Sequence, residues 1–391
     1  ETLVVRGGRI VERCQIEMLP RDREDEIHDL SHSEALDRLD RTLEESVRLH
    51  QRSDGPYGLV LSGGIDSSAI LALMTRLNER PVRAFTVGFS HAAVHDERDH
   101  ARKVAKRMGA EHLEVEFSED DFWRFLPQVA AAVDDPTADY AILPTWKLAR
   151  EAAQELKVVL CGEGGDELFA GYGRYRSQLR PWWQGGRTLR SKGILDGLGL
   201  LRIEPKSWRD SLDAAQATAT FPHRTRLQIA QATDCADWLP NDLLTKLDRC
   251  LMTHGLEGRT PFLDREVAKV AFSLSDEMKI KKGLGKWLLR QWLERVLPEA
   301  QPFERKRGFT VPVGEWIRRK GDQLGPLVAA QPAIVEICHP NRVEKVFRSA
   351  NKRAGKAAWM LLFYALWHNG LTHAKTADSD VFNSLSQTTM V

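Results

Sequence analysis

From Tyr57 onward, short apolar runs alternate with segments of helical periodicity. The runs are "YGLVL", "RAFTV", "LEVEF" and "KVVLC", and a helical segment follows each of the first three. Strands that are apolar on both faces suit a parallel sheet covered by helices on each side. The strand–helix repetition therefore predicts an α/β fold, a doubly wound and mostly parallel sheet. Residues 176–270 are expected to be mostly helical, and residues 285–296 to form an amphipathic helix, so the C-terminal portion is helical.

The segments at the two ends have a different character. Residues 1–22 predict two short strands around a turn at Gly7-Gly8. After a charged linker, the pair Ser31 and Glu34 predicts a capping box that opens a helix. The apolar stretch at residues 357–367 is too short to span a membrane and is expected to be a buried helix. Residues 373–391 are polar and are expected to be disordered.

The first predicted strand ends in the loop "LSGGIDSS", residues 61–68. Gly63 and Gly64 allow backbone conformations in which successive N–H groups point into one concavity at a helix start, which forms an anion site. Asp66 would repel a phosphate unless a cation lay between them, and Mg²⁺ binds carboxylate and phosphate oxygens together. The loop therefore predicts a site for Mg²⁺-pyrophosphate. The alternative is a glycine turn followed by an aspartate that the helix dipole favours.

A second loop of the same type follows the strand "KVVLC". It reads "CGEGGDELFAGYGRY", residues 161–175, and its glycines permit close approach of a ligand. Asp166 is predicted to be a second Mg²⁺ ligand that faces Asp66. Glu163 is a candidate for orienting or deprotonating a substrate group, whereas Glu167 is expected to be an ordinary acid at a helix start.

These two loops resemble those of a known family. "LSGGIDSS" is similar to the pyrophosphate loop of ATP pyrophosphatases of the PP-loop type, and "CGEGGDELFAGYGRY" resembles the matching loop of glutamine-hydrolysing asparagine synthetases. The resemblance continues through residues 244–264 and 303–316 and covers about residues 30–370 in order. It implies the synthetase domain of that family, with a fold like that of adenine nucleotide α-hydrolases.

The resemblance also implies a reaction and a set of site residues. ATP and Mg²⁺ would activate the aspartate side-chain carboxylate as an acyl-adenylate, and ammonia would then give asparagine, AMP and pyrophosphate. Pyrophosphate and metal would be bound by Ser62, Gly63, Gly64, Asp66 and Ser67, with Asp166 as the second metal ligand. The adenosine portion would contact Leu61, Val87, Cys161 and Gly162. Glu163 would assist adenylate formation, and Lys286 and Lys306 match the two phosphate-binding lysines of the family.

One segment departs from the family pattern. The family usually has DEPFADPSAIPT where this chain has "DDPTADYAILPT", so Thr137 replaces a phenylalanine and Tyr140 a proline. In the family this segment shapes the pocket for the acid substrate, so the resemblance leaves open which acid this chain would use. A related adenylating amide ligase of the β-lactam synthetase or lasso-peptide cyclase type is one alternative, and a catalytically silent nucleotide-binding scaffold is another.

Charge and cysteine content set the remaining expectations. Lys and Arg number 56 against 55 Asp and Glu, which disfavours nucleic acid as a partner. Five scattered cysteines indicate free thiols and a cytoplasmic protein, and neither a signal peptide nor a membrane association is expected. Members of the asparagine synthetase family carry an N-terminal glutaminase domain with a cysteine nucleophile at its start, and no residue here matches that cysteine. The resemblance therefore implies that ammonia comes from a glutaminase domain absent here. Residues 1–30 would be the remnant of that domain and its linker, residues 31–372 the ligase domain, and a homodimer is possible.

Overall fold

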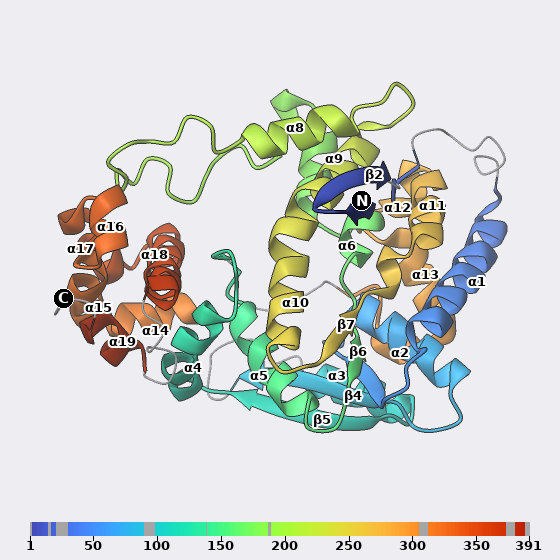
Figure 1. The fold of residues 1–391 in the computed structure, drawn as a ribbon. Coiled ribbons are helices and arrows are strands. Elements are labelled where there is room, and N and C mark those ends of the chain that lie inside the picture. Colours follow the sequence, from blue (N-terminus) through green and yellow to red (C-terminus); the bar gives the residue numbers. More distant parts are fainter. Residues whose placement is uncertain are drawn as a thin grey trace.

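A five-stranded parallel sheet organises the fold and lies in the lower part of the view in Figure 1. The computed structural model describes residues 2–14, 17–20, 30–89, 98–137, 139–186, 189–304, 312–372 and 380–387. The strands of the sheet are β3 (Tyr57–Val60), β4 (Arg83–Phe89), β5 (Glu111–Phe117), β6 (Val158–Leu160) and β7 (Glu257–Arg259). Every pairing is parallel, in the order β5-β4-β3-β6-β7, which confirms the predicted doubly wound α/β fold.

The order of the strands reverses direction between β3 and β6. From β3 the chain proceeds outward through β4 to β5, and it then returns to place β6 and β7 on the other side of β3. In open α/β sheets, ligands bind at such a switch point, beyond the carboxyl ends of the strands. The two glycine loops follow β3 and β6, so the topology brings them together there.

Helices follow or cover each strand. In the first half of the chain they are α1 (His32–His50), α2 (Ile65–Leu77), α3 (Arg98–Arg107), α4 (Glu119–Ala131), α5 (Ile142–Ala152), α6 (Gly165–Leu168) and α7 (Gly173–Leu179). The middle contains α8 (Asp210–Ala219), α9 (Arg226–Ala236), α10 (Thr245–Met252), α11 (Arg265–Ser273), α12 (Asp276–Lys279) and α13 (Trp287–Val296). The last group is α14 (Val313–Arg319), α15 (Gly321–Ala329), α16 (Pro332–Ile337), α17 (Pro340–Arg348), α18 (Lys352–Thr372) and α19 (Val381–Gln387).

Both faces of the sheet are buried at its central strands β3, β4 and β6, as continuous apolar strands require, whereas the edge strand β5 alternates exposed and buried residues. Along β6 and the residue after it, Val158 and Leu160 face a first core formed with α1, α2, α11 and α13. Val159 and Cys161 point to the opposite face, into a second core formed with α5 and α10. Because successive side chains of a strand alternate between faces, an apolar run without alternation indicates burial on both.

The C-terminal helices build a third core beside α4 (Figure 1). The apolar stretch within α18 lies in this core, which confirms the expected buried helix. The prediction that residues 373–391 are disordered is wrong for α19, since Val381 and Leu385 are fully buried against neighbouring helices. The described helices include none whose length and apolar content would allow it to cross a bilayer.

Two local predictions near the N-terminus are confirmed. Strands β1 (Thr2–Arg6) and β2 (Arg9–Cys14) form an antiparallel hairpin whose turn glycines, Gly7 and Gly8, both have positive φ. Ser31 and Glu34 form the capping box of α1, with the Ser31 N–H donating to Glu34 Oε2 at 2.8 Å. By contrast β7 was missed, because its three residues "EGR" have no apolar pattern.

Candidate active site

The first glycine loop is held in shape by its own serines. The Ser67 hydroxyl lies 3.0 Å from the Ser62 hydroxyl, and it also accepts the Ser62 backbone N–H at 3.2 Å. Gly64 N–H donates to Ser62 Oγ at 3.2 Å, and Gly63 has a φ of 73°, in the left-handed region that favours glycine. The loop therefore has the curved, glycine-dependent backbone at the start of α2 that an anion site needs.

The second loop packs directly against the first. A Cβ added at Gly162 would lie 3.0 Å from Asp66 Cβ and 3.2 Å from the Ser67 nitrogen. A Cβ at Gly165 would overlap the Asp66 carboxylate. A side chain would be crowded at Gly162 and would displace the Asp66 carboxylate at Gly165, so the glycines predicted to allow close approach do so between the two loops themselves.

Asp66 and Asp166 meet at one buried lysine. Lys286 Nζ forms ion pairs with Asp66 Oδ2 and, at 2.7 Å, with Asp166 Oδ1, and the lysine side chain is only 3% exposed. Burial lowers the pKa of Lys286, but the Asp166 and Asp66 carboxylates outweigh it and raise the pKa above its ordinary value. The structure thus brings together two predicted metal ligands and one predicted phosphate-binding lysine.

The backbone at Lys286 is as constrained as its side chain. Lys286 has a φ of 57°, and its N–H donates to the Phe169 carbonyl at 2.9 Å. One turn later, the buried Arg290 donates from Nε to the Gly285 carbonyl at 2.7 Å and from Nη1 to the Pro302 carbonyl. Arg290 therefore links the residue before Lys286 to the segment that leads towards Lys306, which itself lies outside the described residues.

The donor set fits Mg²⁺ bound together with a nucleotide. Two carboxylates that reach the same ammonium group are also close enough to share a cation. Within the described ranges, no three His, Cys, Asp or Glu side chains gather to form a metal site on their own. Mg²⁺ commonly uses one or two carboxylates, with phosphate oxygens completing its shell. Asp66 and Asp166 would hold it in this way.

A second polar group surrounds Glu163, and sequence reasoning missed its key member. Lys246 on α10 is buried and pairs with Asp139 Oδ2 at 2.7 Å. Burial raises the pKa of Glu163, and the nearby Lys246 only partly opposes the shift. Burial likewise lowers the pKa of Lys246, but Asp139 and Glu163 outweigh it and raise the pKa. The signal in the sequence was slight, because Lys246 is one of many lysines and only tertiary folding places it near Glu163.

The segment that departs from the family pattern forms a wall of this second group. The Thr137 hydroxyl donates to Asp242 Oδ1 at 2.6 Å, and both residues are buried. Burial raises the pKa of Asp242, with the Thr137 hydrogen bond opposing the shift. A phenylalanine at position 137 could not make this bond, so the substitution changes the polarity of the wall.

The residues expected to contact adenosine lie at the strand ends. Leu61 and Cys161 are buried, and their side chains belong to the first and second cores respectively. The Leu61 carbonyl accepts the Thr86 hydroxyl at 2.5 Å, and Cys161 N–H donates to the Arg259 carbonyl. Val87 is partly buried on β4. All five cysteines are free thiols.

Comparisons with known proteins identify the family of this chain. The family model described as asparagine synthase matches residues 38–369. A protein of Mycobacterium tuberculosis (strain H37Rv), provisionally named a glutamine-hydrolysing asparagine synthetase, is 34% identical over 375 residues, covering 85% of this chain and 57% of the relative. Glutamine-hydrolysing asparagine synthetase 1 of Bacillus subtilis (strain 168) is 30% identical over 366 residues, covering 83% and 58%. Asparagine synthetase B of Escherichia coli (strain K12) is 27% identical, covering 75% and 47%.

The matches to the first two relatives cover similar fractions of their lengths. The chain spans somewhat more than half the length of the first two of these relatives, with 57% and 58% of them covered. The matched region contains the whole sheet and both glycine loops. Because the family model covers most of the chain and two of these relatives share at least 30% identity with it, the chain belongs to the asparagine synthase family.

Proposed function

We propose that this chain is an ATP- and Mg²⁺-dependent ligase that adenylates a carboxylic acid and transfers ammonia to it, with the aspartate side chain as the substrate group. The observation that carries the proposal is the convergence of Asp66 and Asp166 on Lys286 where the sheet reverses direction. Two acids and a lysine beside an anion-binding loop suit pyrophosphate as a leaving group. Mg²⁺ bound there would supply positive charge that offsets the crowded phosphate oxygens.

The proposed reaction has two balanced steps. A carboxylate oxygen of the acid attacks the α-phosphorus of ATP, and the bond to the bridging oxygen breaks to release pyrophosphate. Ammonia then attacks the acyl carbon, AMP leaves with the former carboxylate oxygen, and the amide nitrogen loses a proton. Both steps depend mainly on positioning and charge neutralisation.

Each side chain has a role in this scheme. The first loop would bind the β- and γ-phosphates through Ser62, Ser67 and backbone N–H groups, and Lys286 would neutralise pyrophosphate as it forms. Lys306 is proposed to add a second positive charge in the same step. Glu163, whose raised pKa makes proton uptake easier, would orient the acid or accept a proton from the attacking amine.

A related ligase acting on another carboxylate is the second candidate. The observation that favours it is the Thr137–Asp242 hydrogen bond, which gives the wall near Glu163 a polarity unlike that of a phenylalanine. A substrate with a polar group in place of the usual contact would fit that wall.

The test is a product assay over a panel of acids. The chain is incubated with ATP, Mg²⁺, one acid and either ammonium or glutamine, and AMP, pyrophosphate and the amide are measured. We expect asparagine from aspartate and ammonium, with a rate that rises from about pH 7 to 9 as free ammonia increases, and none from glutamine in the isolated chain.

The other outcomes of this assay discriminate between the candidates. Amide formation with a different acid would favour the related ligase. Absence of AMP with every acid would contradict the adenylating function and leave a nucleotide-binding scaffold.

A further inference from the structure

Helix α6, which carries Asp166, is held in place by hydrogen bonds from α9. Gln231 and Asp234 lie three residues apart on α9, on one face of the helix, and neither is exposed to solvent. The Gln231 side-chain amide Nε2 donates to the backbone carbonyls of Glu167 and Leu168, at 2.7 Å each. A single buried side chain therefore binds two carbonyls of α6.

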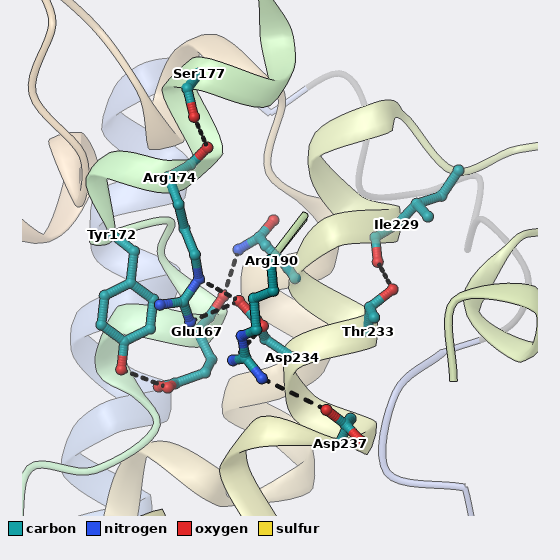
Figure 2. A network of polar contacts seen from close by, with 10 residues as sticks. Glu167, Tyr172, Arg174, Ser177, Arg190, Ile229, Thr233, Asp234 and Asp237 are labelled. Atoms are coloured by element: carbon teal, nitrogen blue, oxygen red, sulfur yellow. Dashed lines mark hydrogen bonds and ion pairs between the residues drawn. The ribbon is translucent and has the colours of Figure 1, made fainter. Parts of the chain in front are cut away.

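Asp234 binds the following helix, α7, through the side chain of Arg174. Figure 2 shows Arg174 and Arg190 directed at Asp234, and Arg174 Nη2 and Arg190 Nη2 lie 2.8 and 3.0 Å from its two oxygens. The Arg174 guanidinium also lies 3.8 Å from the centre of the Tyr172 ring, whose hydroxyl donates to Glu167 Oε1. The segment from α6 to α7 is thus tied to α9 at both ends.

This external support matters because α6 has only four residues. The last four carbonyls of a helix have no partner within it. In α6 the Gly165 and Asp166 carbonyls accept the N–H groups of Phe169 and Gly171, whereas the Glu167 and Leu168 carbonyls accept the Gln231 amide. Buried carbonyls without a partner cost about 1–3 kcal/mol each. Gln231 satisfies two of them at once, immediately after Asp166.

Lys279 determines which way the Gln231 amide faces. Lys279 Nζ donates to Gln231 Oε1 at 3.2 Å, and Lys279 is only 1% exposed. A protonated lysine offers donors only, so the oxygen of the amide faces Lys279 and the nitrogen faces α6. The three groups form one directed chain from α12 through α9 to the second loop.

We propose that Gln231, oriented by Lys279, is a positioning residue that fixes Asp166 relative to Asp66 for binding of the metal–nucleotide complex. This inference rests on the proposed function of the loops as a Mg²⁺–ATP site. Side chains behind metal ligands typically change metal affinity by about 10- to 100-fold when they are removed. The link here acts through the backbone of α6, so it controls the place of the Asp166 carboxylate and not its charge.

The test compares Gln231→Leu with the matched control Gln228→Leu. Gln228 lies on the same helix, is also buried, and donates from Nε2 to the Phe272 carbonyl at 2.7 Å, outside the site. The readout is the affinity for Mn²⁺, measured by electron paramagnetic resonance in the presence of a non-hydrolysable ATP analogue. We expect Gln231→Leu to weaken Mn²⁺ binding about tenfold, and Gln228→Leu to leave it unchanged.

Unaltered Mn²⁺ affinity in folded Gln231→Leu, or an equal loss in both variants, would overturn the proposal. If Gln231→Leu does not fold, Lys279→Met replaces it, because the amide is then free to turn. That variant is expected to weaken Mn²⁺ binding, by less than the loss in Gln231→Leu, and no change would overturn the proposal as well. A failure of the proposed function differs from either result, because the unaltered chain would then bind Mn²⁺ and the analogue but release no AMP.

Discussion

Each of the two glycine loops places one aspartate beside Lys286, but the loops are stabilised in opposite ways. The first loop is supported by hydrogen bonds among its own residues, such as those between Ser62 and Ser67, and it begins the thirteen-residue helix α2. The second begins the four-residue helix α6, and its supporting side chain, Gln231, lies 64 residues beyond Glu167 in the chain. The contacts that stabilise the first loop are thus local in sequence, whereas those that stabilise the second depend on the tertiary fold.

Because of this difference, the two loops should respond differently to substitutions elsewhere in the chain. In the first loop, a substitution should act mainly on the groups proposed to contact phosphate. In the second, the same function should also respond to changes in α9, α12 and the Lys286 turn, because these hold α6 in place. Substitutions that spare one loop and affect the other would sharpen the comparison.

The largest effect is expected where the loops meet. Asp66→Asn and Asp166→Asn each remove one carboxylate from the pair around Lys286, so each should lower Mg²⁺-dependent pyrophosphate release by about 10³-fold. Steady-state pyrophosphate release by the purified variants, with circular dichroism to confirm folding, provides the measurement. Near-normal turnover in either folded variant would remove that residue from the metal site.

Glycine substitutions should distinguish the loops by about 10²-fold in activity. A Cβ at Gly171 would overlap both Asp166 Oδ1 and Lys286 Cε. A Cβ at Gly64 would meet only Ser62 Oγ, at 3.2 Å. We therefore expect Gly171→Ala to lose most pyrophosphate release and Gly64→Ala to lose little.

The pyrophosphate assay of these two glycine variants can also contradict the comparison. Equal losses in Gly171→Ala and Gly64→Ala would show that the second loop tolerates displacement as well as the first. The contrast between a local and a tertiary loop would then fail.

The support of the second loop should also respond to pH. Burial lowers the pKa of Lys279 to about 8, below its ordinary value of 10.5. Between these two values the unfolded chain binds more protons than the folded one, so the free energy of unfolding should rise with pH in this window. The rise should be on the order of 3 kcal/mol at most, and it should be absent in Lys279→Met.

Urea unfolding of both proteins from pH 7.5 to 10.5 measures this difference. Other groups titrate in both proteins, so only the difference in slope between them is informative. Parallel slopes would mean that Lys279 is solvated and does not face Gln231 as a buried cation.

The smallest effect is expected in the first loop. Ser67→Ala removes the hydroxyl that bonds Ser62 and Gly64, at a cost of about 1 kcal/mol, or roughly fivefold, in ATP binding. The dissociation constant of Mg²⁺–ATP measures it. If Ser67→Ala lowered pyrophosphate release as much as Asp66→Asn does, the first loop would not be supported by several redundant local hydrogen bonds.

The contrast between the loops also explains what the sequence could predict. Parallel strands and a local glycine loop follow from short-range patterns, so the sheet, the Ser31 capping box and the glycine loop at the start of α2 could be predicted. Asp166 was predicted from the repetition of the same pattern after β6. The meeting of Asp66, Asp166 and Lys286 followed only from the resemblance and from the expectation that strand ends share one edge.

The residues that were missed act over long sequence separations. Lys246 lies 107 residues from Asp139 and Gln231 lies 48 residues from Lys279, and no periodicity marks such pairs. Likewise α19 is short and polar in composition, and its burial depends on α4, α15 and α18. Tertiary packing, which single-sequence patterns do not encode, decides all three.

Transfer of oxygen from the acid to AMP tests the central claim most directly. Aspartate labelled with ¹⁸O in its side-chain carboxylate is supplied with ATP, Mg²⁺ and ammonium, and the AMP is analysed by mass spectrometry. If the two loops form an adenylating site, each AMP should carry one ¹⁸O atom, because the carboxylate oxygen that attacks the α-phosphorus leaves with AMP. Unlabelled AMP would show that water attacks ATP, and ADP in place of AMP would show cleavage at another phosphate; either result would contradict the account.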